Sequence, residues 1–406
     1  MIMHILFISQ YFYPEIGAAS ERFTGFAVNS ALAGHKVTVI TGFPNYPFGR
    51  EYPGYKKRLF DVEDFNGVKV IRVWLFTSGS AGVPSRLLNY LTFMFSSVMA
   101  GLIVPNVNCI VATSGPIFAG LAGCIVSTIK KVPFVFDVRD IWPERIYAGT
   151  AIQRGRAIRM LEHLELFLYR KSAAITVVTR GVKENIVSKG VSSDKVSLIT
   201  NGVNTTIFFP KTKDPVLAGN LGIGENKFVV IYAGTIGLLQ DNDIILASAE
   251  RLKDYGDILF LVIGDGAKRG EFADKVKKLQ NVMLLPLVSQ KELCGYINLS
   301  DVGINTNTKH PHNNMTIPVK MFPYMACRKP VVLANTGEIA ELVKNYNIGR
   351  CVHPGDAEAF SNAILDFYND RDLLKQCGEN GFQLVNEKFS TEKIALHLLS
   401  VIRTAS

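Results

Sequence analysis

Several signatures of common protein classes are missing from this sequence. It has no Walker-type phosphate loop, no full G-x-G-x-x-G dinucleotide fingerprint and no readable Ser-His-Asp arrangement. Its six cysteines lie in mostly apolar contexts and form no C-x-x-C pair. That pattern argues against a zinc site or a disulfide framework and predicts reduced core thiols in a cytosolic protein. No Arg/Lys-rich helix or RNA-binding motif is present, so nucleic acid is the weakest candidate partner.

The sequence also shows no clear cluster of metal ligands and no signal-peptide pattern. His310 and His312 flank Pro311 in KHPHNN, but no carboxylate or cysteine cluster lies nearby, which favours a loop over a metal site. The amino-terminal stretch MIMHILFISQYF is apolar, yet it has no basic n-region and no small-residue cleavage site. We therefore predict no bound metal, and we interpret this stretch as a first strand rather than a signal peptide.

The composition is apolar and its positive charge is unevenly placed. With 406 residues, 48% of them hydrophobic, the chain exceeds what one core usually serves, which predicts two globular domains. Residues 1–206 hold 22 Lys and Arg against 13 Asp and Glu, a net charge of +9. Residues 207–406 hold 22 of each and are neutral. An anionic membrane or a phosphorylated substrate is therefore a candidate partner of the first half.

Short Val/Ile-rich segments alternate with helical patterns in both halves of the chain. In the first half we predict strands at 4–9, 36–41, 68–73, 109–113, 134–137 and 174–178. In the second half we predict strands starting at 228 and at 259–263, 282–285, 302–304 and 331–333. This alternation predicts an α/β fold of two Rossmann-like domains facing each other across a cleft. We place the domains at 1–206 and 207–388, and a last helix at 389–406 that packs back towards the first domain.

Three turns rich in small residues follow predicted strands. Gly17 lies just before a helix, YAGTIG contains Gly234 and Thr235, and GDG contains Gly264 and Asp265. In open parallel sheets, ligands bind outside the carboxyl ends of the strands. A glycine turn that opens a helix lets backbone N–H groups approach a phosphate. One such turn is weak evidence, but three of them predict a ligand that carries phosphate.

The segment PVKMFPYMACRKPVVL contains a lysine placed for an anion. Lys320 precedes apolar residues, including Phe322 and Tyr324, whose spacing suits one face of a short helix. Its ammonium group would then lie near the helix N-terminus, where a phosphate is favoured. The alternative is a solvated lysine between an ordinary helix and strand.

Two further loops carry charge after predicted strands. In FDVRDIWPERIYAG, the residues Asp137, Arg139, Asp140 and Glu144 crowd together, which is costly unless they are paired or meet a ligand. A structural Asp–Arg pair that caps the next helix is the alternative. In GEIAEL, Glu338 either accepts hydrogen bonds from sugar hydroxyls or caps a helix.

Residues 84–104 form an apolar stretch in which Arg86 is the one charged residue. The stretch approaches membrane-spanning length, but Asn89 and Thr92 dilute it and no basic flank follows. The remaining alternatives are a helix buried in the first domain and a helix lying in the membrane interface, near Lys56, Lys57, Arg58 and Arg86. We favour the second, because the positive excess lies in the same half.

Taken together, the motifs resemble those of the retaining glycosyltransferases of family four, which have the GT-B fold. They are QYFYPEIGAAS, GHKVTVITGFPNYPFG with its later GYK, VRDIWPE, NGVN, YAGTIG, GDG, and VKMFPYMACRKPVV followed by GE. The resemblance runs over essentially the whole chain. It is closest to the bacterial group of the L-fucosamine transferase type that acts in O-antigen and capsule assembly.

The resemblance implies an activity and a location. It implies transfer of an amino or deoxyamino sugar from a UDP-sugar donor, with retention and without metal or cofactor. The implied acceptor is a saccharide linked to undecaprenyl diphosphate, and the implied location is cytoplasmic, peripherally associated with the inner membrane. The alternatives are a nucleotide-sugar epimerase on the same fold and a catalytically impaired paralogue that binds nucleotide sugars.

The resemblance also assigns roles to particular residues. Lys320 and backbone groups near Gly17 would stabilise the leaving diphosphate, and Arg139 and Asp140 would orient the sugar. Donor contacts are implied for Gly17, Gly234, Thr235, Gln240, Gly264, Asp265, Lys320, Glu338 and Glu341. Acceptor contacts are implied for Asn45 and Tyr46.

One position departs from the family pattern. Many members carry two glutamates separated by seven residues, and the second binds the ribose of the nucleotide. Here Met315 and Pro323 occupy these positions. One or two charge-assisted hydrogen bonds, about 1 to 3 kcal/mol each, are therefore absent. Either Glu338 or Glu341 holds the ribose instead, or donor affinity is weak, or this copy is impaired.

Overall fold

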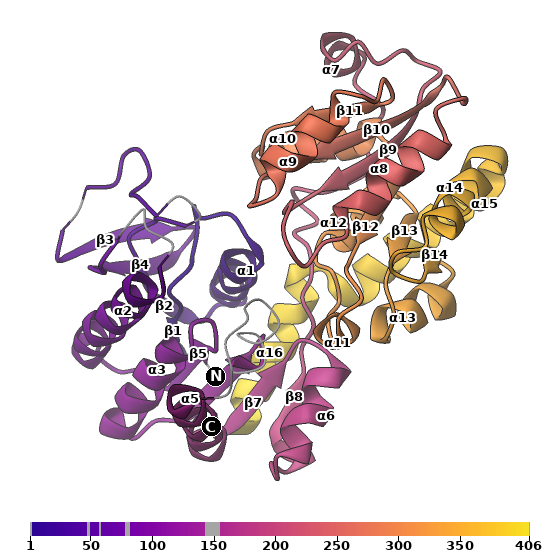
Figure 1. Ribbon diagram of the computed structural model, residues 1–406. Helices are drawn as coiled ribbons and strands as arrows, with labels where there is room; N and C mark the ends of the chain where they lie inside the picture. Colours follow the sequence, from indigo (N-terminus) through magenta and orange to yellow (C-terminus); the bar gives the residue numbers. More distant parts are fainter. Residues whose placement is uncertain (1, 47–48, 57, 78–81, 143–154, 406) are drawn as a thin grey trace. The chain divides into compact units, whose positions relative to one another are not determined.

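The computed structural model describes residues 2–46, 49–56, 58–77, 82–142 and 155–405. The chain divides into two compact units, Met1–Asn201 with Thr391–Ser406, and Gly202–Ser390 (Figure 1). The first boundary falls at 201 rather than at the predicted 206. The reason is that the backbone N–H of Val203 donates to Phe389 O at 2.9 Å, so that this residue pairs with the second unit.

The first unit is built on an eight-stranded sheet of order β3-β4-β2-β1-β5-β6-β7-β8. The strands are β1 (His4–Ile8), β2 (Lys36–Gly42), β3 (Phe60–Phe65), β4 (Val68–Val73), β5 (Cys109–Thr113), β6 (Phe134–Val138), β7 (Ala174–Val177) and β8 (Val196–Leu198). β3 pairs antiparallel with β4, and the other described neighbours pair in parallel. β1, β5 and β6 are buried along their whole length, because parallel strands with helices on both faces lie between two apolar layers.

Helices cover both faces of this sheet. α1 (Ala18–Leu32) and α16 (Thr391–Ala405) lie on one face, where Phe23 and Phe26 share a core with Leu398 and Ile402. The other face is covered by α2 (Val83–Ile103), α3 (Ile117–Lys130), α5 (Arg156–Lys171) and α6 (Arg180–Ser188). The last helix therefore belongs to the first unit, although the whole second unit separates it from the rest of that unit in sequence.

The second unit is built on a six-stranded parallel sheet of order β11-β10-β9-β12-β13-β14. The strands are β9 (Phe228–Ala233), β10 (Ile258–Ile263), β11 (Val282–Leu285), β12 (Val302–Thr306), β13 (Val331–Ala334) and β14 (Gly349–Val352). With helix-covered parallel sheets in both units, the predicted α/β class of two Rossmann-like domains is confirmed. The strand order reverses between β9 and β12, and in such sheets the ligand site lies at the carboxyl ends of the strands at this point.

The helices of the second unit also pack on both faces of their sheet. They are α7 (Pro215–Asn220), α8 (Asn242–Arg251), α9 (Arg269–Val276), α10 (Gln290–Leu299), α11 (Pro311–Asn314), α12 (Met321–Ala326), α13 (Glu338–Tyr346), α14 (Ala357–Asn369) and α15 (Arg371–Leu384). α10, α12 and α13 share one core with the sheet, and α8, α9 and α14 share the other.

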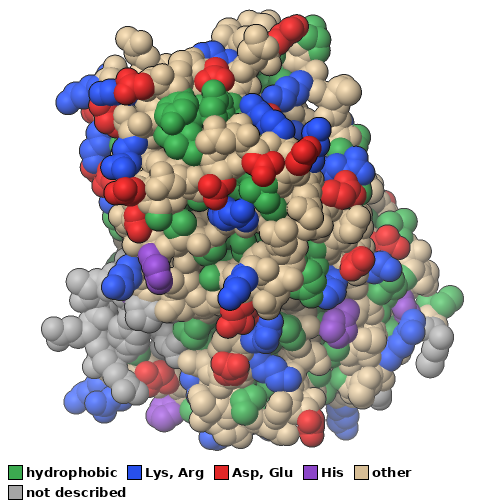
Figure 2. All heavy atoms as spheres, turned by 90° about the vertical axis from the view of Figure 1, so that its right-hand side faces the viewer, with side chains coloured by type: hydrophobic (Ala, Val, Ile, Leu, Met, Phe, Trp, Pro, Cys, Tyr) green, Lys and Arg blue, Asp and Glu red, His purple; other side chains and the backbone are tan. Residues whose placement is uncertain are grey.

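Charge is mixed over the surface shown in Figure 2. Acidic and basic side chains are interspersed there, and apolar side chains form separate patches. This face therefore has no broad patch of one charge. A polyanionic partner would require a broad patch of positive charge.

Candidate functional site

Lys320 lies at the carboxyl ends of β9 and β12, directly before α12. The helix is anchored by its buried residues, among them Met321 and Phe322. The Lys320 Nζ donates to the Tyr232 hydroxyl at 2.8 Å and lies 4.0 Å from the centre of the Tyr232 ring. The Tyr232 hydroxyl in turn donates to Thr235 O at 2.6 Å. The predicted lysine and the predicted YAGTIG turn are thus joined through Tyr232, the first residue of that turn, for which no role was predicted.

Two glycines make room for this lysine. Gly234 has φ 153°, and a Cβ atom there would lie 2.9 Å from both Cε and Nζ of Lys320. A Cβ atom at Gly264 would lie 1.9 Å from Gly234 O. Any larger residue at either position would displace the loop or the lysine. The structure therefore brings Gly234, Gly264 and Lys320 together, although 86 residues separate the two outer positions in sequence.

The side-chain amine of Lys320 changes its protonation state near neutral pH. Burial lowers the pKa of Lys320 to about 7. No carboxylate among the described residues forms an ion pair with it. A doubly charged diphosphate beside this amine would favour its protonated form and raise its pKa again. The arrangement is thus suited to receive an anion, because the site itself supplies no counter-charge.

Helix α12 is held against the sheet by Tyr324. The Tyr324 hydroxyl accepts a hydrogen bond from Ala233 N at 2.8 Å, and its ring packs so closely on Gly303 that a Cβ atom there would clash. Pro323 is the third residue of α12, and its carbonyl oxygen accepts from Cys327 N at 3.1 Å. The helix thus starts at Met321, directly after Lys320 as the sequence predicted, and Pro323 lies in its first turn. A proline fits there because first-turn N–H groups have no partner within the helix.

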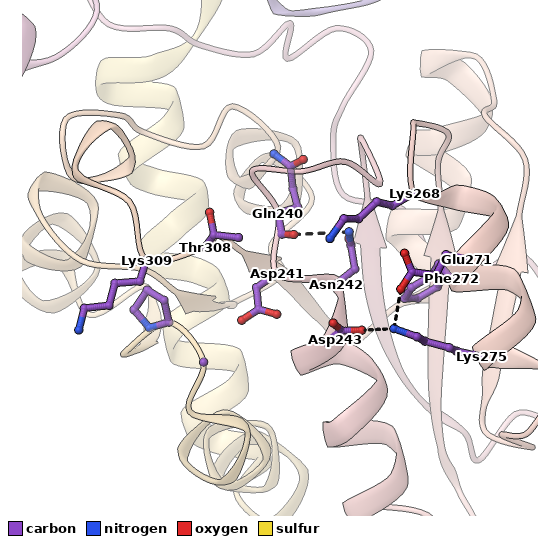
Figure 3. A pocket seen from close by; sticks show the side chains of 12 residues that line it. Gln240, Asp241, Asn242, Asp243, Lys268, Glu271, Phe272, Lys275, Thr308 and Lys309 are labelled. Atoms are coloured by element: carbon purple, nitrogen blue, oxygen red, sulfur yellow. Dashed lines mark hydrogen bonds and ion pairs between the residues drawn. The ribbon is translucent and has the colours of Figure 1, made fainter. Parts of the chain in front are cut away.

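Gln240, Thr308 and several charged residues line a pocket of about 310 Å³ beside α8. Figure 3 shows the Gln240 side chain pointing away from those of Asp241 and Asp243. Lys275 closes one side of the pocket through ion pairs of 2.8 Å with both Asp243 and Glu271. Gln240 therefore has its backbone at the pocket while its amide group faces elsewhere.

Asp265, Glu338 and Glu341 lie in loops or first turns that follow strands of the same sheet. Asp265 accepts a hydrogen bond from Gly266 N at 2.7 Å, so part of its charge stabilises the GDG turn. Glu338 and Glu341 belong to the first turn of α13, which follows β13. β13 pairs with β12, so both glutamates belong to the same edge of the sheet as Lys320.

The predicted residues of the first unit form a second group. Asn45 and Tyr46 follow β2, and their backbone N–H groups donate to one carboxylate oxygen of Glu15 at 2.8 and 2.9 Å. A Cβ atom at Gly17 would lie 3.7 Å from the Tyr46 ring. Glu15 is 5% exposed, and burial raises its pKa to about 7. Sequence reasoning passed over Glu15, although an acidic residue between apolar residues in YFYPEIG was a usable signal.

The charged loop after β6 has a different pairing from the expected one. Asp137 is fully buried and pairs at 2.7 Å with Arg22, which lies outside this loop. Thr176 donates to the same carboxylate at 2.6 Å. Arg139 N donates to Ser114 Oγ at 3.0 Å, and Ser114 Oγ donates to Asp140 O at 3.4 Å. Asp137 is thus structural, while Arg139 and Asp140 are held at the strand end. Glu144 lies outside the described residues.

Helix α2 is buried along one face only. Phe93, Met94, Ser97 and Gly101 are buried, whereas large apolar side chains on other faces are exposed. The exposed fractions are 65% for Phe95, 65% for Met99 and 79% for Ile103. By length and composition alone the helix is long and apolar enough to cross a membrane, a test that core helices of soluble proteins also pass. The helix is therefore neither wholly buried nor wholly exposed.

No cluster of three or more His, Cys, Asp or Glu side chains that would hold a metal ion is found in the part of the chain that the structure describes.

Each of the two units matches the model of a known protein family. Residues 17–202 match the family model "Glycosyl transferase 4-like domain", and residues 215–384 match "Glycosyl transferases group 1". Together these matches span most of the chain.

Two curated relatives and one solved structure illustrate the likeness. The alpha-maltose-1-phosphate synthase of Mycolicibacterium smegmatis is 23% identical over 71% of this chain and 77% of its own. The capsular polysaccharide biosynthesis glycosyltransferase CapM of Staphylococcus aureus is 24% identical over 72% and 76%. The Anabaena Alr3699/HepE structure in complex with UDP-glucose has a TM-score of 0.72 at 18% identity, covering 99% of this chain and 100% of that chain. That likeness shows the fold, which is GT-B.

Proposed function

Since the chain belongs to the group 1 glycosyltransferases with a 4-like amino-terminal domain, we propose that it transfers a sugar, with retention, from a UDP-sugar to a lipid-linked saccharide. The implied product is a surface polysaccharide of the O-antigen or capsule type. CapM, whose name refers to capsular polysaccharide, supports that class of product. The UDP-glucose complex of the Anabaena relative supports a UDP-sugar donor. An amino or deoxyamino sugar remains our choice of donor sugar.

The observation that carries the proposal is the environment of Lys320. Its ammonium lies at the switch point of the second sheet, against Gly234, with a pKa near 7 and no carboxylate partner among the described residues. When a sugar leaves UDP, negative charge grows on the diphosphate oxygens. The attraction between the charged lysine and the diphosphate grows with that negative charge, so Lys320 stabilises the transition state more than the bound donor, which is the requirement for catalysis.

The proposed chemistry needs no protein nucleophile. The bond between the sugar C1 and the diphosphate oxygen breaks, and a bond from C1 to the acceptor hydroxyl oxygen forms on the same face. The proton of that hydroxyl passes to the departing diphosphate. The protein's contribution is alignment of the two substrates and stabilisation of charge. Thr235, Gly264 and Asp265 would hold the nucleotide, and Arg139 and Asp140 would orient the sugar.

We propose a peripheral position on the cytoplasmic face of the inner membrane, with an undecaprenyl-diphosphate-linked saccharide as acceptor. Residues 1–206 carry a net charge of +9, and α2 of the same unit exposes Phe95, Met99 and Ile103. Apolar side chains together with positive charge favour an anionic membrane surface. Fractionation of cells with and without high salt tests this. Recovery in the soluble pool at both salt concentrations would contradict it.

The activity itself is tested with purified protein, a panel of UDP-sugars and a lipid-diphosphate saccharide. The expected result is an elongated lipid-linked product and one free UDP for each sugar transferred. Conversion of a UDP-sugar in the absence of acceptor would instead indicate an epimerase. Calorimetric binding of UDP with no turnover of any donor would indicate a binding protein without activity, as Pro323 allows.

A further inference from the structure

Four aromatic side chains form a row along the carboxyl-terminal edge of the first sheet. Tyr46 follows β2, Tyr11 follows β1, Tyr90 belongs to α2 and Trp142 follows β6. The ring centres of Tyr11 and Tyr46 lie 5.3 Å apart, and those of Tyr90 and Trp142 lie 5.9 Å apart. The side chains of Tyr11 and Tyr90 are joined by a hydrogen bond. We call these four residues the aromatic row.

Polar contacts beneath the aromatic row fix its members in place. The Gln10 Nε2 donates to Asn89 Oδ1 at 2.6 Å, and Asn89 Nδ2 donates to Phe76 O at 2.6 Å. These bonds tie the loop before Tyr11 to the helical turn that carries Tyr90. At the other end, Glu15 accepts the backbone N–H of Tyr46. The rings are therefore held by three elements that are far apart in sequence, which is an expensive arrangement for a surface without a ligand.

The aromatic row is neither core nor ordinary surface. Tyr46 is 49% exposed, and the other three residues of the row are partly exposed. The row thus places aromatic rings and tyrosine hydroxyls side by side at a partly exposed surface. A tyrosine hydroxyl is neutral near pH 7 and can both donate and accept, and burial raises the pKa of Tyr11 further above its ordinary value.

A pyranose ring has the matching chemistry. One of its faces carries mostly C–H groups, which pack on an aromatic ring, and its edge carries hydroxyls that pair with neutral polar groups. A diphosphate would instead require cations, and the four side chains of the row carry none. The chemistry of the row therefore favours the sugar part of an acceptor over its phosphates.

We propose that the aromatic row is the subsite for the terminal pyranose of the acceptor, with Tyr46 and Tyr11 stacking on the sugar and Tyr90 hydrogen-bonding its hydroxyls. The proposal deepens the function proposed above and rests on it for the identity of the acceptor. Tyr11, Tyr90 and Trp142 are new assignments, since the sequence predicted only Tyr46 and its neighbour Asn45.

The direct test needs no turnover. The chain has two tryptophans, so Trp74→Phe leaves Trp142 as the reporter of the row. Methyl glycosides of glucose, galactose and N-acetylglucosamine are titrated into this variant, with inorganic pyrophosphate as the matched anion. We expect saturable quenching by at least one glycoside and none by pyrophosphate. Tyr46→Ala in the same background should weaken the glycoside about tenfold. No saturable change with any glycoside up to its solubility limit would overturn the proposal.

A second arm uses the transfer reaction. Tyr46→Ala and Tyr11→Phe should raise the KM for the lipid-linked acceptor, by about tenfold and about threefold, and leave the KM for the UDP-sugar unchanged. Phe60→Ala, which removes an exposed ring on β3, is the control. Unchanged acceptor KM in both variants would overturn the subsite while leaving the glycosyltransferase assignment intact. Absence of transfer by the unaltered protein would remove the assignment, and the glycoside titration would still decide whether the row binds sugar.

Discussion

Lys320 and Glu15 are buried ionisable groups with opposite fates. Burial moves the pKa of each to about 7, downward for the lysine and upward for the glutamate. The chain itself satisfies Glu15, which accepts backbone N–H groups from Phe12, Asn45 and Tyr46. Lys320 donates to one tyrosine hydroxyl and has no carboxylate partner in the described ranges. A buried charge saturated by the backbone organises a loop, whereas one left without a counter-ion is available to a ligand.

Removal of the lysine should have the largest effect. Lys320→Ala is expected to lower kcat at least about a hundredfold, because one preorganised group that stabilises the leaving diphosphate is lost. The measurement is UDP release with saturating donor and acceptor. Lys227→Ala is the matched control. Lys227 lies directly before the amino end of β9, whereas Lys320 lies at the carboxyl end of that strand, and Lys227 Nζ donates to Gly256 O. Equal kcat for the two variants would remove Lys320 from the mechanism.

Removal of the Glu15 charge should change stability rather than chemistry. Its folded pKa of about 7 exceeds the ordinary 4.5, so the native state binds more protons and stability falls as pH rises from about 4.5 to about 7. Arg72 opposes this shift through its charge. In Glu15→Gln the amide oxygen still accepts from Asn45 and Tyr46 but cannot ionise. We expect the variant to gain about 3 kcal/mol over the parent at pH 8 and nothing at pH 4.5.

Both tryptophans, Trp74 and Trp142, lie in the first unit, so fluorescence during urea unfolding follows that unit. The parent and the Glu15→Gln variant are compared at several pH values. Parallel stability curves for the two proteins would mean that the pKa of Glu15 is the same in the folded and unfolded states, which would contradict the prediction.

Donor binding should take up a proton at Lys320. Above pH 7 the free amine is mostly neutral, and the diphosphate restores its charge. UDP affinity is therefore expected to fall by about tenfold per pH unit above 7, with close to one proton taken up per UDP at pH 8. Calorimetry in buffers with different ionisation enthalpies measures this uptake. Lys320→Arg, which stays charged, should abolish it, and uptake that persists in this variant would assign the proton to another group.

The sequence predicted what local chemistry determines. The parallel strands were predicted from their apolar runs, and the glycine turns predicted where the backbone and a ligand come close. Strand β3, with the sequence FDVEDF, was missed because an exposed edge strand need not be apolar. The structural Asp–Arg pair was considered only within the loop, whereas the partner of Asp137, Arg22, lies 115 residues away. Contacts of that kind depend on tertiary approach, which no local pattern encodes.

The same limit explains why the burial of Lys320 and Glu15 was not predicted. The sequence indicated that Lys320 precedes a helix, but its contact with Gly234 and Tyr232 exists only once α12 docks on the sheet. Glu15 gains its significance when the loop after β2 folds over it. In both cases the residue type was visible and its burial was not.

The smallest expected effect concerns the position where this chain departs from its family. Pro323 is the third residue of α12, in the first turn after Lys320, and it offers no carboxylate to a ribose. Pro323→Glu would supply one to two charge-assisted hydrogen bonds, and we expect UDP to bind about five- to tenfold more tightly. Pro323→Ala is the control, because it relieves the proline without adding a carboxylate. Equal affinity of the two variants would mean that another group, with Glu338 and Glu341 of α13 as the candidates, already holds the ribose. Adding Glu338→Gln and Glu341→Gln to Pro323→Glu would then test these candidates. The affinity for UDP should fall only if one of the two replaced carboxylates holds the ribose.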